Sequence, residues 1–101
     1  MVYETSSIDA TLSAAAGANP ALHAELKAAF LDSIDRQVDL MSRSRCDGNW
    51  HMAGMRLRAI AASFHADGLI ALADEATTGA PGDPSIIRRI KAFIGELRNP
   101  L

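Results

Sequence analysis

The clearest indication of the fold comes from residues 50–64, Trp50-His51-Met52-Ala53-Gly54-Met55-Arg56-Leu57-Arg58-Ala59-Ile60-Ala61-Ala62-Ser63-Phe64. At about 100° of rotation per residue, this stretch forms an amphipathic helix. Its apolar side lies within about 60° of Leu57 and is made of Trp50, Ala53, Ile60, Ala61 and Phe64. Met55 falls almost opposite Leu57, so the sequence places a methionine at the centre of the solvent side.

The remainder of the chain predicts further helices. Asn19-Pro20 is a start signal, with asparagine as N-cap and proline at the first helical position. Apolar residues then recur every three or four positions, and we expect this long helix to end near residues 43–45. Asp83-Pro84 repeats the start signal for the last helix. Between them, a helix beginning at Asp67 is ended by Thr77-Thr78-Gly79.

Two local expectations concern helix ends. Residues 1–7 are predicted to be a loose lead-in, followed by a short helix from Asp9 to Ala16 that Gly17 stops. Asp47 or Asn49 is expected to cap the helix of residues 50–64.

The pattern predicts one domain over residues 1–101 and an all-α fold. Four amphipathic helices with short connections favour an antiparallel four-helix bundle, with the short first helix capping one end. Apolar residues make up 49% of the chain and aromatic residues only 5%, and no segment alternates as a strand does, so a sheet is not expected.

Charge, hydropathy and cysteine content limit the partners and the cellular location that the sequence leads us to expect. The net charge is −2, which gives no electrostatic reason to expect nucleic acid as a partner. No apolar run approaches the ~18 residues of a membrane span, and no export signal is recognisable at the start. Cys46 is the only cysteine and has no internal disulfide partner. A cytoplasmic protein is the simplest expectation.

No catalytic or metal-binding motif stands out. The histidines His23, His51 and His65 have none of the spacings typical of metal ligands. Serine and aspartate residues lack the context of an activated nucleophile, and no glycine-rich phosphate loop is present. We therefore expect no metal, no cofactor and no enzymatic activity.

The solvent side of residues 50–64 is the candidate binding surface instead. Methionine and alanine make it smooth and weakly apolar, and arginines flank it, which is typical of surfaces that bind another protein. Its predicted contact residues are His51, Met52, Met55, Arg56, Arg58, Ala59 and Ala62. A second basic group, Arg88, Arg89 and Lys91 on the last helix, is interpreted as solvated surface or as a rim for an acidic partner.

At these residues the chain resembles the histidine-containing phosphotransfer (HPt) domains of bacterial phosphorelays. That family has a short helix followed by a four-helix bundle, with a signature of histidine, any residue, leucine, lysine and glycine. Here Met55-Arg56-Leu57-Arg58-Ala59 takes those places, and residues 61–66 follow as the family's small-residue run does. Residues 67–76 match its next helix, and the resemblance covers about Ile8 to Leu97.

Several substitutions depart from the family pattern. Met55 replaces the phosphorylated histidine, and a thioether has no nitrogen that accepts a phosphoryl group stably. Ala59 replaces the glycine that lets a partner's backbone come close, whereas Arg58 keeps the positive charge of the lysine. His65 stands where the family usually has glycine.

The resemblance thus implies a signalling protein that binds a response-regulator receiver domain or a histidine kinase without carrying phosphate. One alternative is an active phosphotransfer protein that uses His51, although this residue lies about 6 Å along the helix axis from position 55. Another is a helical module that self-associates through its exposed methionines. The expected state is a monomer or a weak homodimer.

Overall fold

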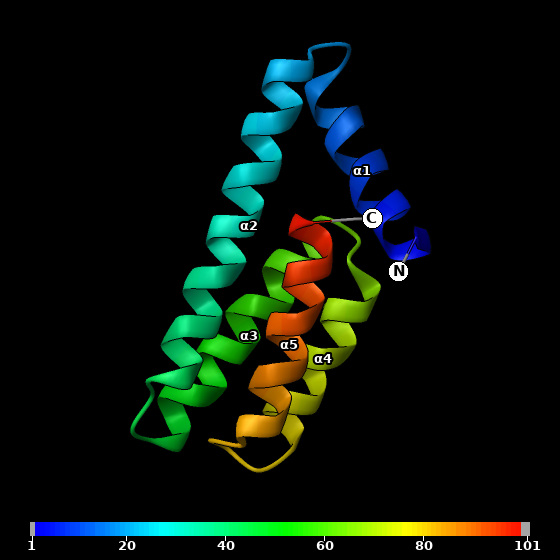
Figure 1. The fold of residues 1–101 in the computed structure, drawn as a ribbon. Coiled ribbons are helices and arrows are strands. Elements are labelled where there is room, and N and C mark those ends of the chain that lie inside the picture. The colour runs from blue at the N-terminus through cyan, green and yellow to red at the C-terminus, as the bar shows by residue number, and fades with distance from the viewer. Residues whose placement is uncertain (1, 100–101) are drawn as a thin grey trace.

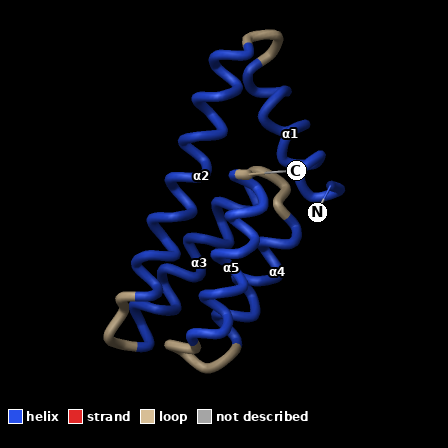
Figure 2. Tube along the Cα trace, in the orientation of Figure 1, coloured by secondary structure: helices blue, strands red, loops and turns tan. Residues whose placement is uncertain are grey.

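The computed structural model describes residues 2–99, with the side chains of residues 7–99, and these residues form five helices and no strand. The helices are α1 (Val2–Ala16), α2 (Pro20–Ser42), α3 (Asp47–Ser63), α4 (Asp67–Thr78) and α5 (Pro84–Arg98). Short turns connect them (Figure 2). The prediction of an all-α protein is therefore confirmed.

Helices α2 to α5 pack around a common interior. α2 contacts α3 and α5, and α4 also contacts α3 and α5, while α1 packs against α2. Consecutive helices run in opposite directions, and α1 lies beside the N-terminal half of α2 (Figure 1). α2 is the longest helix, with 23 residues, and its N-terminal part extends beyond the three helices that follow it (Figure 1).

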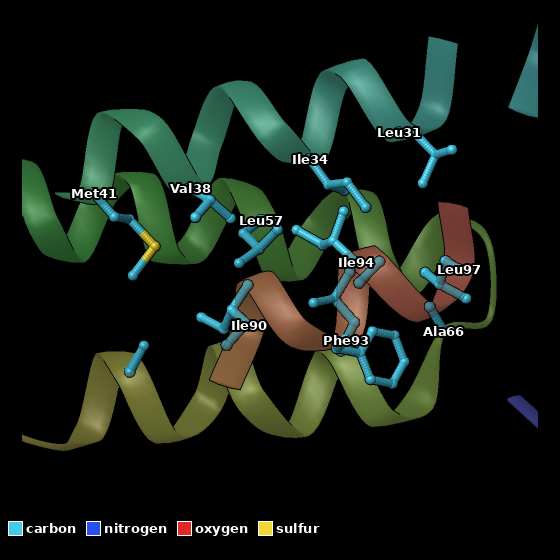
Figure 3. Close-up of a cluster of buried hydrophobic side chains, with 14 of the residues drawn as sticks. Leu31, Ile34, Val38, Met41, Leu57, Ala66, Ile90, Phe93, Ile94 and Leu97 are labelled. Carbon is cyan, nitrogen blue, oxygen red and sulfur yellow. The ribbon is translucent and has the colours of Figure 1, made fainter. Parts of the chain in front are cut away.

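One apolar cluster fills this interior. From α2 it takes Ile34, Val38 and Met41, which meet Leu57 of α3 and the side chain of Ile90 on α5 (Figure 3). Each large apolar side chain buried in this way contributes about 1.5–3 kcal/mol to folding. The predicted apolar side of residues 50–64 is confirmed. Its buried residues are Trp50, Ala53, Leu57 and Ala61, and two partly buried residues pack against the cluster, Ile60 and Phe64.

Both predicted start signals of asparagine or aspartate plus proline are confirmed. Asn19 is the N-cap of α2, and its side-chain oxygen accepts a hydrogen bond from the Leu22 N–H at 3.1 Å. Asp83 is the N-cap of α5, and its carboxylate accepts from the Ser85 N–H at 2.9 Å. These bonds satisfy N–H groups that have no partner inside the helix.

Two predicted helix starts were wrong. α1 begins at Val2 rather than near Asp9, so residues 2–7 of the expected lead-in are helical, while Met1 lies outside the described residues. No glycine or proline precedes Gly17, and nothing in the sequence therefore interrupts the helix. The Thr11 hydroxyl also donates to the Ser7 carbonyl at 3.1 Å.

α3 begins three residues earlier than predicted, at Asp47. Its N-cap is Cys46, in an extended conformation and with no side-chain capping bond, so neither Asp47 nor Asn49 caps the helix. Asp47 lies inside the first turn, where its negative charge favours the positive end of the helix dipole.

The turns before α2 and α4 place one residue each in the left-handed backbone region. Gly17 adopts a φ of 64° after α1, which costs glycine little because it has no Cβ. His65 adopts a φ of 56° between α3 and α4 and is the only described residue other than glycine with a positive φ. Its N–H donates to the Ala62 carbonyl at 3.2 Å. A side chain in this conformation costs about 1–2 kcal/mol.

Helices α3 and α4 approach each other closely near one end. The buried Trp50 indole N–H donates to the Ala76 carbonyl at 2.8 Å, and this carbonyl lies in the last turn of α4, where helical partners are lacking. One turn further along α3 is Gly54, where an added methyl group would lie 2.6 Å from Thr77 Cγ2 and 3.6 Å from Met41 Cε. A larger residue fits at this crossing only if the Thr77 side chain shifts.

The strain at His65 leads to a stability prediction. We expect His65→Gly to raise the free energy of unfolding by about 1 kcal/mol, because glycine adopts the left-handed conformation without a clash. Chemical denaturation followed by circular dichroism measures the change. His65→Ala is the matched control, since it removes the imidazole but keeps the Cβ, and it should give no gain. Equal effects of the two substitutions would show that backbone strain is not the cause.

The crossing at Gly54 leads to a second prediction. We expect Gly54→Ala to lower the free energy of unfolding by about 1–2 kcal/mol, because the overlap with Thr77 outweighs alanine's better helix propensity. Thr77→Ser removes the methyl group that causes the overlap. In that background, Gly54→Ala should become neutral or stabilising, and the double-mutant cycle measures this coupling.

Gly95→Ala on α5 is the matched control for the crossing, because an added methyl group there meets no atom within 4 Å. It should stabilise the protein by up to about 1 kcal/mol through helix propensity alone. A Gly54→Ala effect that does not depend on residue 77 would contradict the close approach of the two helices.

Candidate functional site

The solvent side of α3 carries every residue predicted to contact a partner. This surface, called here the outer face of α3, is formed by exposed residues: His51, Met52, Met55, Arg56, Arg58, Ala59 and Ala62. It follows directly from the helix period, because the opposite side of α3 is buried in the core. The structure therefore brings the predicted residues together on one helix.

Met55 lies at the centre of this face and is 55% exposed. Its neighbours one turn away, Ala59 and His51, are exposed as well. A thioether is flexible and polarisable but is neither a proton donor nor a stable phosphoryl acceptor. At this position the chain can offer apolar contact and no group-transfer chemistry.

Arg58 keeps its positive charge on this face but is paired with an acidic residue of α4. Its Nε donates to Asp74 Oδ1 of α4 at 2.7 Å, and each side chain is about half exposed. Arg58 thus turns toward α4 and its charge is balanced. Arg56 lies on the other side of Met55, toward α2, and forms no ion pair with any described residue.

The second basic group lies elsewhere. Arg88, Arg89 and Lys91 are on α5, which packs against α2 and α4, so they do not join the outer face of α3. Arg89 donates two hydrogen bonds to the Glu75 carboxylate, from Nη1 to Oε2 at 2.6 Å and from Nη2 to Oε1 at 3.3 Å. The hydrogen bond to Glu75, together with its charge, raises the pKa of Arg89 above its usual value. This pair ties α5 to α4.

The remaining candidate groups are dispersed. His51, His65 and Cys46 are all exposed, on the outer face, in the α3–α4 turn and at the N-cap of α3. Among the described side chains, those of residues 7–99, no three histidine, cysteine, aspartate or glutamate residues are grouped as a metal ion would require. Over residues 2–99, no helix combines the length and apolar character needed to cross a bilayer.

Two residues that shape the site were not singled out from the sequence. Gly54 fixes the distance between α3 and α4, and the signal for it is a glycine inside an otherwise alanine-rich helix. Asp74 neutralises Arg58 from a different helix. No local pattern indicates that contact, because it depends on how the two helices are aligned.

The chain matches no family model, and neither the curated proteins nor the solved structures contain a match to it.

Proposed function

We propose that this chain is a degenerate HPt-like domain, a four-helix bundle that binds a receiver domain or a histidine kinase in the cytoplasm without carrying phosphate itself. The single observation that carries the proposal is Met55, which occupies the centre of an exposed, smooth helix face where an HPt domain has its histidine. The role is one of binding and not of catalysis.

The packing of the helices supports the bundle. α2 and α4 are each in contact with both α3 and α5, and consecutive helices are antiparallel. This is the arrangement expected of an up-down-up-down bundle with one additional N-terminal helix. In an HPt-like interpretation, α3 is the helix that carries the signature, and its outer face is the surface that a partner contacts.

The chemistry of the outer face supports binding of a partner protein over transfer of a phosphoryl group. Met52 and Met55 are 53% and 55% exposed, and flexible methionine side chains adapt to a partner surface. Ala59 adds a methyl group where the family has glycine, which moves a docked partner slightly outward. Phosphoryl transfer tolerates little displacement of the reacting atoms, whereas apolar docking tolerates more.

The Arg58–Asp74 pair refines the expected charge contacts. A partner carboxylate that approaches the outer face meets Arg56 as a free cation but meets Arg58 already bound to Asp74. We therefore assign the main charge contact of the proposed interface to Arg56. This assignment differs from the family pattern, in which the residue at position 58 supplies the charge.

His51 supports the alternative of active transfer, because it is exposed on the same face as Met55. The two residues are one helical turn apart, about 6 Å along the axis. A receiver that docks with its aspartate opposite residue 55 leaves His51 too far away for attack on the phosphoryl group.

Phosphotransfer from receiver domains tests the proposal. A panel of receiver domains is phosphorylated with radiolabelled acetyl phosphate and mixed with this protein. Gel electrophoresis then measures the acid-labile label on the receiver domain and on this protein. We expect no label on the natural sequence. Met55→His combined with Ala59→Gly should take up label, because it restores an acceptor and a close approach on an otherwise competent face.

Met55→Ala is the matched control and should remain unlabelled. Label on the natural chain that disappears in His51→Ala would establish the alternative and refute the proposal. No label on the double variant with any receiver would contradict the assignment of this face to receiver docking.

A further inference from the structure

A surface groove lies along one edge of the outer face of α3, between the C-terminal end of α2 and the N-terminal half of α3, and shares Met52 and Arg56 with that face. It has a volume of about 650 Å³. Its apolar part is formed by Leu40, Met52 and Ala53, and its charged part by Arg43, Arg45 and Arg56. The groove thus combines residues of two helices and of the turn that joins them.

The apolar part of the groove is unusually exposed. Leu40 is 41% exposed and Met52 is 53% exposed. Only two other large apolar side chains among the described residues are exposed, Leu22 and Met55. Two of these four exposed apolar side chains therefore line one groove, which favours an apolar contact from outside.

The charged side chains that line the groove are all positive. Arg43 pairs with Asp39 at 2.8 Å, one turn before it on α2. The side chains of Arg45 and Arg56 form no ion pair or hydrogen bond with any described residue, and no carboxylate lines the groove. Asp47, in the first turn of α3, is the other acidic residue close in sequence. This positive site stands out in a chain with a net charge of −2.

We propose that this groove binds an acidic, amphipathic segment of a partner protein. A bulky apolar side chain of the segment packs on Leu40 and Met52, and its flanking carboxylates bind the guanidinium groups of Arg45 and Arg56. Arginine favours such contacts because its planar group binds carboxylates through two hydrogen bonds. The interaction shares Met52 and Arg56 with the interface proposed above, but it also uses Leu40 and Arg45 of α2 and the turn, and it requires neither Met55 nor a receiver domain.

A protein segment fits these features better than other anions do. A nucleic-acid backbone supplies negative charge but no side chain for the apolar part of the groove, and the groove offers no aromatic residue on which a base stacks. An anionic bilayer presents charge as a plane, and Arg45 and Arg56 flank a concave surface.

Fluorescence anisotropy with a defined probe tests this inference. The probe is a short fluorescein-labelled peptide of glutamate and leucine that forms an amphipathic helix, and the reference is the same peptide with glutamine in place of glutamate. We expect saturable, salt-sensitive binding of the acidic probe, and at least about tenfold weaker binding of the reference peptide.

Variants locate the binding to the groove. Arg45→Glu and Arg56→Glu should each weaken binding of the acidic probe by about tenfold, and Leu40→Ala should weaken it by several-fold. Arg88→Glu on α5 is the matched control, because Arg88 is also exposed and free of an ion pair, and it should leave binding unchanged. Met55→Ala should likewise have no effect, which separates this groove from receiver docking. Circular dichroism verifies that each variant is folded.

Three results would overturn the inference. These are equal losses from Arg88→Glu and Arg45→Glu, equal binding of the acidic and glutamine peptides, and binding of phosphatidylserine vesicles in preference to the acidic peptide.

Discussion

The close crossing of α3 and α4 decides which side chains of α3 are buried and which are exposed to solvent. Gly54 lets Thr77 approach, and the Trp50 indole N–H binds the Ala76 carbonyl in the last turn of α4. The first contact sets the distance between the two helices and the second sets their alignment. A buried carbonyl without this donor would cost about 1–3 kcal/mol, so sliding one helix along the other is unfavourable.

The alignment of α3 determines which of its side chains are exposed to solvent. With Trp50, Leu57 and Ala61 buried, the helix period leaves Met55 at the centre of the exposed side. The same alignment places Arg58 opposite Asp74, which removes one free charge from the outer face. The apolar, weakly charged character of this face is therefore a consequence of how α3 packs on α4, together with the residue at position 55.

The sequence predicted those features that depend on local chemistry. Asn19 and Asp83 were recognisable as N-caps because each precedes a proline and has a short side chain that accepts a backbone hydrogen bond. The buried side of α3 followed from the spacing of apolar residues. Cys46 was not recognisable as an N-cap, because its side chain makes no capping bond and the helix start is set by the extended backbone at that residue.

Features that depend on two helices at once were not predictable in the same way. The interaction between Arg58 and Asp74 joins residues whose proximity only the helix alignment creates. The groove near Leu40 also requires the end of α2 and the start of α3 to be placed relative to each other. The left-handed conformation of His65, in the turn between α3 and α4, was not predicted from the sequence.

The proposed docking of partners on the outer face of α3 can be measured by the two-dimensional amide spectrum of the isotope-labelled protein during titration with receiver domains. We expect the largest shifts for residues 51–62, with the strongest around Met55 and Arg56, and little change in α1 and α5. Shifts concentrated on α5 or α1, with the α3 amides unchanged, would refute docking on this face.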